Sequence, residues 1–103
     1  LKAAVHDLRS QAAKAVLSGA EIVILSDREQ NNVAIGTSHT YIPPLLAVGA
    51  VHHYLISQGL RTKASLVVNT AQCWSTHHFA CLIGYGVDAV CPYMALQTVQ
   101  DWW

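Results

Sequence analysis

The sequence predicts an α/β fold, a partial parallel sheet or barrel-like piece of a larger domain built from alternating helix–strand units. Apolar residues recur at helical spacing in four stretches, and three short apolar runs lie between them. Strands that alternate with helices and are joined by short turns are typical of right-handed crossover units. Three strands do not complete a barrel, and both ends fall within predicted helices. We therefore expect residues 1–103 to be a fragment of one domain.

Glycine and proline set most of the predicted boundaries. Gly19 and Gly59 end the first two helices, and Pro43 and Pro44 suit the first turn of the second. The strands are short, branched and apolar throughout, as is typical of buried parallel strands. In order, we predict a helix before Gly19, a strand over Glu21–Leu25, a polar loop over Ser26–Tyr41 (with Asn31, Asn32 and Gly36), a helix over Pro43–Gln58, a strand over Ala64–Asn69, a helix over about Cys73–Ile83 ended by Gly84, a strand over Val87–Cys91 and a helix over Tyr93–Trp103.

The composition excludes several classes of protein. Hydrophobic residues make up 52% of the chain and charged residues 12%, so we expect another part of a longer protein, or another subunit, to cover some of its surface. Six basic residues balance six acidic ones, which argues against a nucleic-acid partner. No apolar run reaches the roughly 20 residues of a membrane span. Three cysteines favour reduced thiols over a disulfide framework.

Polar residues follow two of the predicted strands. Ser26, Asp27 and Arg28 come directly after the first strand, where a carboxylate and a guanidinium can bind a ligand or anchor the next loop. A local ion pair and turn is the favoured interpretation. Asn69 and Thr70 close the second strand. Thr70 is a predicted N-cap, and Asn69 is a predicted lining residue of a pocket or passage.

Cysteine and histidine residues suggest a metal site that geometry disfavours. Cys73, His77 and Cys81 are spaced four apart, but the two cysteines would lie about 12 Å apart along a straight helix. One zinc ion cannot bind all three, so we favour buried cysteines that pack as small apolar residues. In each of the pairs His52-His53 and His77-His78, at most one ring can face a given site. We expect one ring of each pair to be hydrogen-bonded at the helix–strand interface and the other to reach a neighbouring element.

The run from Gly84 to Ala89 matches the G-x-G-x-x-A pattern of dinucleotide sites, but its context is wrong. That pattern must follow a strand and open a helix, so that phosphate meets the helix N-terminus. Here it follows a helix and precedes a strand. We interpret these glycines as helix-ending and turn residues.

Seven sequence motifs follow one another along the chain: Ile24–Arg28, Ile42–His53, Gly59–Thr62, Ser65–Val68, His77–Ala80, Leu82–Gly86 and Pro92-Tyr93. This ordered series resembles the central domain of the glutamate synthase large chain, and the resemblance covers nearly the whole chain from about Ile22. The run Asn69–Thr76 is similar to the ferredoxin-dependent branch of cyanobacteria and plastids. The loop Glu29–Thr40 and Val87 depart from the family pattern.

The resemblance implies part of an enzyme that converts glutamine and 2-oxoglutarate to two glutamates, in the cyanobacterial cytoplasm or the plastid stroma. It implies FMN, a 3Fe-4S cluster and ferredoxin for the full enzyme, with the other domains of the same enzyme as partners of this segment. None of the motifs carries the family's catalytic, flavin-binding or metal-binding residues. The segment is expected to be an inactive scaffold that lines the ammonia passage or contacts other domains through Ser26, Asp27, Arg28, His53, Asn69, Thr70, His78 and Tyr93.

Two alternatives stay open at this stage. One is a stand-alone α/β binding module that uses the Cys/His helix for metal. The other is a structural subunit that dimerises through Trp74, Trp102 and Trp103. Elemental analysis would test the first, and sedimentation would test the second.

Overall fold

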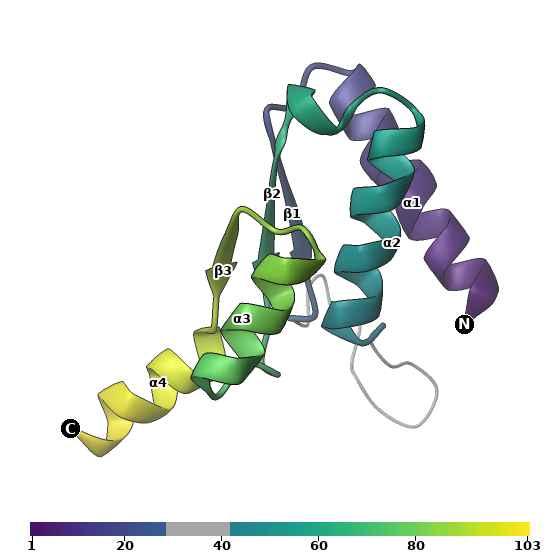
Figure 1. Cartoon of the computed structure of the whole chain (residues 1–103). Helices are drawn as coiled ribbons and strands as arrows, with labels where there is room; N and C mark the ends of the chain where they lie inside the picture. The colour runs from purple at the N-terminus through teal and green to yellow at the C-terminus, as the bar shows by residue number, and fades with distance from the viewer. Residues whose placement is uncertain (29–41) are drawn as a thin grey trace.

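A computed structural model describes residues 1–28 and 42–103, and the predicted loop around Asn31, Asn32 and Gly36 lies outside them. Helices and strands alternate along the described chain, which confirms the α/β prediction (Figure 1). The elements are α1 (Lys2–Leu17), β1 (Ile22–Ser26), α2 (Pro44–Ser57), the 3₁₀ helix η1 (Arg61–Lys63), β2 (Ser65–Asn69), α3 (Thr76–Tyr85), β3 (Ala89–Cys91) and α4 (Tyr93–Trp102). No helix within the described ranges is long and apolar enough to cross a membrane.

The three strands form one parallel sheet in the order β1-β2-β3. Ile24 pairs with Val67 in the register, and Val67 pairs in turn with Ala89. Because each strand lies beside the one before it, both right-handed crossovers place their helices, α2 and α3, on the same face of the sheet. Because β1 and β2 are parallel neighbours, their carboxyl ends, Ser26 and Asn69, lie next to each other. We call this side of the sheet its carboxyl edge.

An apolar core lies between this face of the sheet and the helices. Val23 and Leu25 of β1 and Leu66 and Val68 of β2 are buried in it, together with residues of α1, α2 and α3. The residues between them in the strands point to the opposite face, and in β1 these are exposed. The expectation that the strand over Glu21–Leu25 is buried throughout is therefore wrong for this chain, because its helices cover only one side of the sheet.

The third helix differs from its predicted range of Cys73–Ile83. It begins at Thr76, because the Ser75 side chain caps it by accepting a hydrogen bond from the His78 backbone N–H. The helix continues through Gly84 and ends at Gly86, where φ is +124°. Thr70 is not the cap, because it lies six residues before the helix. Thr70 is instead buried and bonded at the strand ends.

Candidate functional site

The Asp27 carboxylate connects three elements at the carboxyl edge of the sheet. One oxygen accepts a hydrogen bond from the Thr70 hydroxyl at 2.7 Å, and the other accepts one from the Tyr93 hydroxyl at 2.8 Å. The Ala71 backbone N–H lies 3.2 Å from both oxygens. These donors come from the turn after β2 and the start of α4, so one half-buried side chain after β1 fixes all three chain segments to one another. Hydrogen bonds to a charged acceptor are about twice as strong as neutral ones.

Ser26, Arg28 and Asn69 complete this group at the same edge. The Asn69 amide donates to the Ser26 hydroxyl at 3.1 Å, which joins the ends of β1 and β2 on the open face of the sheet. The Arg28 guanidinium lies over the Tyr93 ring, with its Cζ 5.2 Å from the ring centroid. We call Ser26, Asp27, Arg28, Asn69, Thr70 and Tyr93 the strand-end cluster. Six of the eight residues singled out in the sequence thus lie together.

The chemistry of the strand-end cluster differs from the predicted ion pair. Within residues 1–28 and 42–103, the only ion pair joins Arg61 and Asp88, and Asp27 is bonded to hydroxyl and amide donors instead of Arg28. The Arg28 side chain turns toward the Tyr93 ring. Both carboxylate oxygens of Asp27 are already hydrogen-bonded, so the geometry is that of a structural brace. The exposed polar groups beside it are those of Ser26, Asn69 and Arg28.

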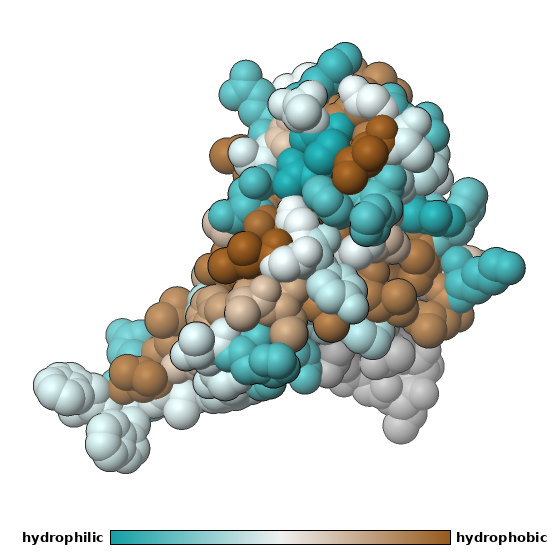
Figure 2. Space-filling view, in the orientation of Figure 1, coloured by the Kyte–Doolittle hydropathy of each residue, from teal (hydrophilic) through white to brown (hydrophobic). Residues whose placement is uncertain are grey.

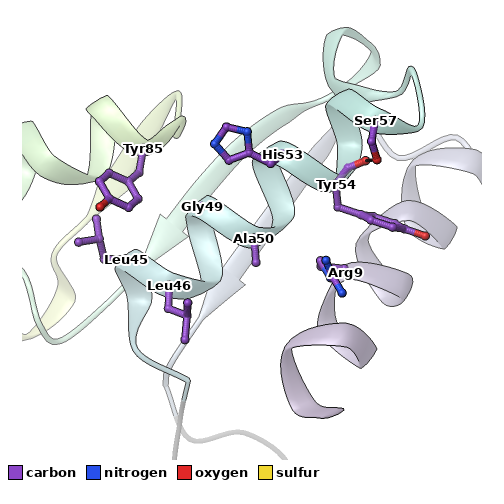
Figure 3. Close-up of a pocket in the computed structure, with 9 residues that line it drawn as sticks. All are labelled: Arg9, Leu45, Leu46, Gly49, Ala50, His53, Tyr54, Ser57 and Tyr85. Carbon is purple, nitrogen blue, oxygen red and sulfur yellow. Dashed lines mark hydrogen bonds between the residues drawn. The ribbon is translucent and has the colours of Figure 1, made fainter. Parts of the chain in front are cut away.

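His53 lies apart from this cluster, in a groove of about 390 Å³ on the outer surface of α2. Figure 3 shows the groove running across α2, with Tyr85 of α3 on one side and Arg9 of α1 on the other. The Arg9 guanidinium lies 5.3 Å from the centroid of the Tyr54 ring. Leu45, Leu46, Gly49, Ala50 and Ser57 complete the lining.

His78 lies in the first turn of α3 and is exposed. Its Nδ1 accepts a hydrogen bond from the Trp74 backbone N–H at 2.9 Å, so this ring stabilises the turn before the helix. The expectation that one ring of the pair packs at the helix–strand interface is wrong for His77 and His78, because both are exposed. In the other pair His52 is half-buried and hydrogen-bonded as expected, but its partner Arg61 belongs to η1 and its ring lies beside the Gly86 turn.

The Cys/His metal arrangement does not form on one helix. Cys73 precedes α3 and is only 1% exposed, and burial raises the pKa of its thiol. Its packing as a small apolar residue is confirmed. Cys81 is half-buried, and its sulfur lies 3.5 Å from the Nε2 atom of exposed His77. The part of the chain that the structure describes contains no group of three or more His, Cys, Asp or Glu residues able to hold a metal ion.

A second polar network lies at the amino-terminal ends of β2 and β3, and it was not predicted from the sequence. The Arg61 side chain, 16% exposed, donates to His52 Nδ1 at 2.9 Å, to the carbonyl oxygens of Ala64 and Gly86, and to the Asp88 carboxylate at 2.8 Å. The partners lie up to 27 residues from Arg61 in the sequence, so no spacing rule finds them.

Two pKa values in this Arg61 network are shifted. The Leu66 backbone N–H, followed by the Arg61 guanidinium, lowers the pKa of Asp88. Burial, followed by the positive charge of Arg61, lowers the pKa of His52. Both shifts favour an ionised Asp88 and a neutral His52, which is the state in which Nδ1 can accept the bond from Arg61. The network therefore acts as a structural clamp that holds η1 against the turn after α3.

The fold and the strand-end cluster define a segment of an α/β domain whose polar strand ends are braced by Asp27. A family model for the glutamate synthase central domain matches residues 1–103, so the chain belongs to this family. It is 58% identical over its whole length to ferredoxin-dependent glutamate synthase 2 of Synechocystis sp., of which it spans 7%. It is 55% identical over 99% of its length to ferredoxin-dependent glutamate synthase of Pyropia yezoensis, and 52% identical over 99% to ferredoxin-dependent glutamate synthase 1, chloroplastic/mitochondrial, of Arabidopsis thaliana, in each case spanning 6% of the relative.

Proposed function

We propose that the chain is part of a ferredoxin-dependent glutamate synthase, an oxidoreductase that forms two glutamates from glutamine and 2-oxoglutarate. The observation that carries this proposal is 58% identity along the entire chain to a relative of that name. The other named relatives come from a red alga and a plant, which supports the cytoplasm of a cyanobacterium or a plastid as the location. By family resemblance, the full enzyme uses FMN, a 3Fe-4S cluster and ferredoxin.

Within that enzyme, this segment is a scaffold that helps to wall the ammonia passage and to hold the domains together. The strand-end cluster supports this role, because Asp27 fixes the ends of β1, β2 and the start of α4 in one rigid edge. Ser26, Asn69 and Arg28 present polar groups at that edge without forming a catalytic arrangement. His53 and His78, which lie outside the cluster, are assigned to contacts with other domains.

The passage is tested in the full-length enzyme by comparing glutamate formation from glutamine with glutamate formation from added ammonia. Asn69→Leu replaces an amide at the strand end with an apolar side chain and removes one hydrogen bond, to Ser26. We expect the glutamine-dependent rate to fall several-fold while the ammonia-dependent rate is maintained. Lys14→Ala, on the exposed side of α1, is the control and should change neither rate. Equal losses of both rates in Asn69→Leu would contradict a role in the passage.

The identity of the whole enzyme has its own test. The purified full-length protein is expected to form glutamate with reduced ferredoxin and much more slowly with NADPH. A preference for NADPH would contradict the proposed donor.

A further inference from the structure

The groove on the outer surface of α2 is hollow because this helix carries two small residues there. Gly49 and Ala50 lie between Tyr85 of α3 and Arg9 of α1 (Figure 3). A Cβ added at Gly49 would lie 3.2 Å from Cδ2 of Tyr85, so the missing side chain lets this ring lie close against α2. The volume of the groove, about 390 Å³, lies at the lower end of the range that is typical of small-molecule sites, about 300–1,000 Å³.

The Arg9 guanidinium lines this groove without a charged partner. Its Nη2 donates to His6 Nδ1 at 3.2 Å, and its Nε is buried and has no hydrogen-bond partner. Within residues 1–28 and 42–103 no carboxylate pairs with it, since the ion pair found there joins Arg61 and Asp88. Half-buried charges are normally paired, because desolvation of an unpaired charge is costly. The groove therefore has one positive charge that an anion would complement.

The remaining lining of the groove is mostly apolar and aromatic. Leu45 and Leu46 contribute aliphatic surface, and Leu46 is 43% exposed. The Tyr54 ring lies against the guanidinium, with Cζ of Arg9 5.3 Å from the ring centroid, so the positive charge adjoins an aromatic wall. Figure 2 shows brown apolar side chains among teal polar ones over α1 and α2. Among the described residues that line the groove, Arg9 alone is permanently charged, which suits a single negative charge better than a doubly charged phosphate.

We infer that the groove binds a small organic monocarboxylate, with the carboxylate on Arg9 and an aromatic or aliphatic body on α2 between Tyr54 and Tyr85. A guanidinium holds a carboxylate through two parallel hydrogen bonds, and the aromatic walls bury the apolar body. This site goes beyond the proposed function, because it lies on the helical side of the sheet and does not include the strand-end cluster. Binding to it requires neither ferredoxin nor glutamine.

Two probes of the same shape test the role of the charge in the wild-type, full-length protein. 3-Phenylpropanoate carries the carboxylate, and 3-phenylpropanamide replaces it with a neutral amide. Saturation-transfer NMR titrations measure the binding of each probe. We expect the acid to bind with a Kd of about 1 mM or below, and the amide to bind at least about tenfold more weakly. Equal binding of the two probes, or no binding of the acid, would overturn the proposal.

Substitutions in the full-length protein locate the bound acid. Arg9→Gln removes the charge and should weaken binding of the acid by at least about tenfold, whereas Arg9→Lys keeps the charge and should recover part of the loss. Lys14→Gln removes one charge from an exposed position of the same helix and is the matched control, which should bind as the wild type does. Ala50→Phe fills the floor of the groove and should abolish binding.

Two results from the variants would show that the acid binds elsewhere and would overturn the proposal. One is wild-type binding by Arg9→Gln, and the other is wild-type binding by Ala50→Phe. The comparison of acid and amide needs no variant, so it decides the question if a substitution prevents folding. Failure to form glutamate with ferredoxin would contradict the proposed function alone, because the NMR titrations measure binding without turnover.

Discussion

The turn at Gly86 allows a quantitative test of the clamp around Arg61. Gly86 has a φ of +124°. A Cβ added there would lie 2.6 Å from Cδ2 of His52, and Nδ1 and Cγ of the same ring would be closer still. The ring cannot move away freely, because its Nδ1 accepts the 2.9 Å hydrogen bond from Arg61. The substitution Gly86→Ala therefore combines backbone strain with a steric clash.

The expected loss can be estimated from these two effects. A non-glycine residue in a strained backbone region costs about 1–3 kcal/mol, and overpacking of a filled site costs about 1–3 kcal/mol more. We expect Gly86→Ala to lower the free energy of unfolding by about 4 kcal/mol, a large fraction of the stability of a small domain. Urea denaturation followed by far-UV circular dichroism measures this loss.

Gly19→Ala and a double variant separate the two effects. Gly19 has a φ of +103° but no atom within 4 Å of an added Cβ, so Gly19→Ala retains the strain without the clash, and about 1–2 kcal/mol is expected. In a His52→Ala background, Gly86→Ala should likewise cost about 1–2 kcal/mol, because the ring is gone. The reasoning is refuted if Gly86→Ala costs no more than Gly19→Ala, or if removing the His52 ring recovers none of the loss.

Three further predictions concern the two polar networks. Asp27→Asn keeps the shape of the side chain but loses the charge that accepts bonds from Thr70, Ala71 and Tyr93, so unfolding free energy should fall by about 1–3 kcal/mol; a change below 0.5 kcal/mol would show that the brace is weak. Arg61→Lys keeps the charge but loses the planar fork, and it should cost on the order of 2 kcal/mol in urea denaturation, whereas a neutral outcome would argue that charge alone matters. The folded-state pKa of His52 is lowered, so its contribution is fully present above the unfolded value of about 6.5 and is lost as pH falls through the folded pKa. Urea midpoints between pH 5 and 8 should show this loss in the wild type and a smaller one in His52→Gln.

The fold was predictable because its signals are local. Gly19, Gly59 and the Pro43-Pro44 pair mark helix ends through backbone conformation, and the structure places helix boundaries beside all of them. The start of α3 was predicted too early, because Thr70 and Ser75 are both good capping residues. The choice between them depends on Asp27, which lies directly after β1 and accepts a hydrogen bond from the Thr70 hydroxyl.

The candidate site was predictable only in part. Ser26, Asp27, Asn69 and Thr70 were singled out because they stand at the ends of predicted strands, and the structure brings them together because the two parallel strands end side by side. Their bonding partners were not predictable, since the Tyr93 hydroxyl lies 66 residues from Asp27 in the sequence. The Arg61 network was missed for the same reason.

The sequence by itself determined the alternation of helices and strands, the absence of a nucleic-acid-binding charge pattern, and the resemblance to glutamate synthase. These depend on composition, periodicity and ordered motifs, which are properties of the chain before it folds. Only the tertiary structure decided that Asp27 binds hydroxyl and amide groups instead of Arg28, and that Arg61 clamps His52 and Asp88. It also decided that Ile22 and Ile24 lie on a bare face of the sheet. Contacts across such long separations depend on which sides of the elements meet, and an apolar strand has the same sequence whether one face is covered or two.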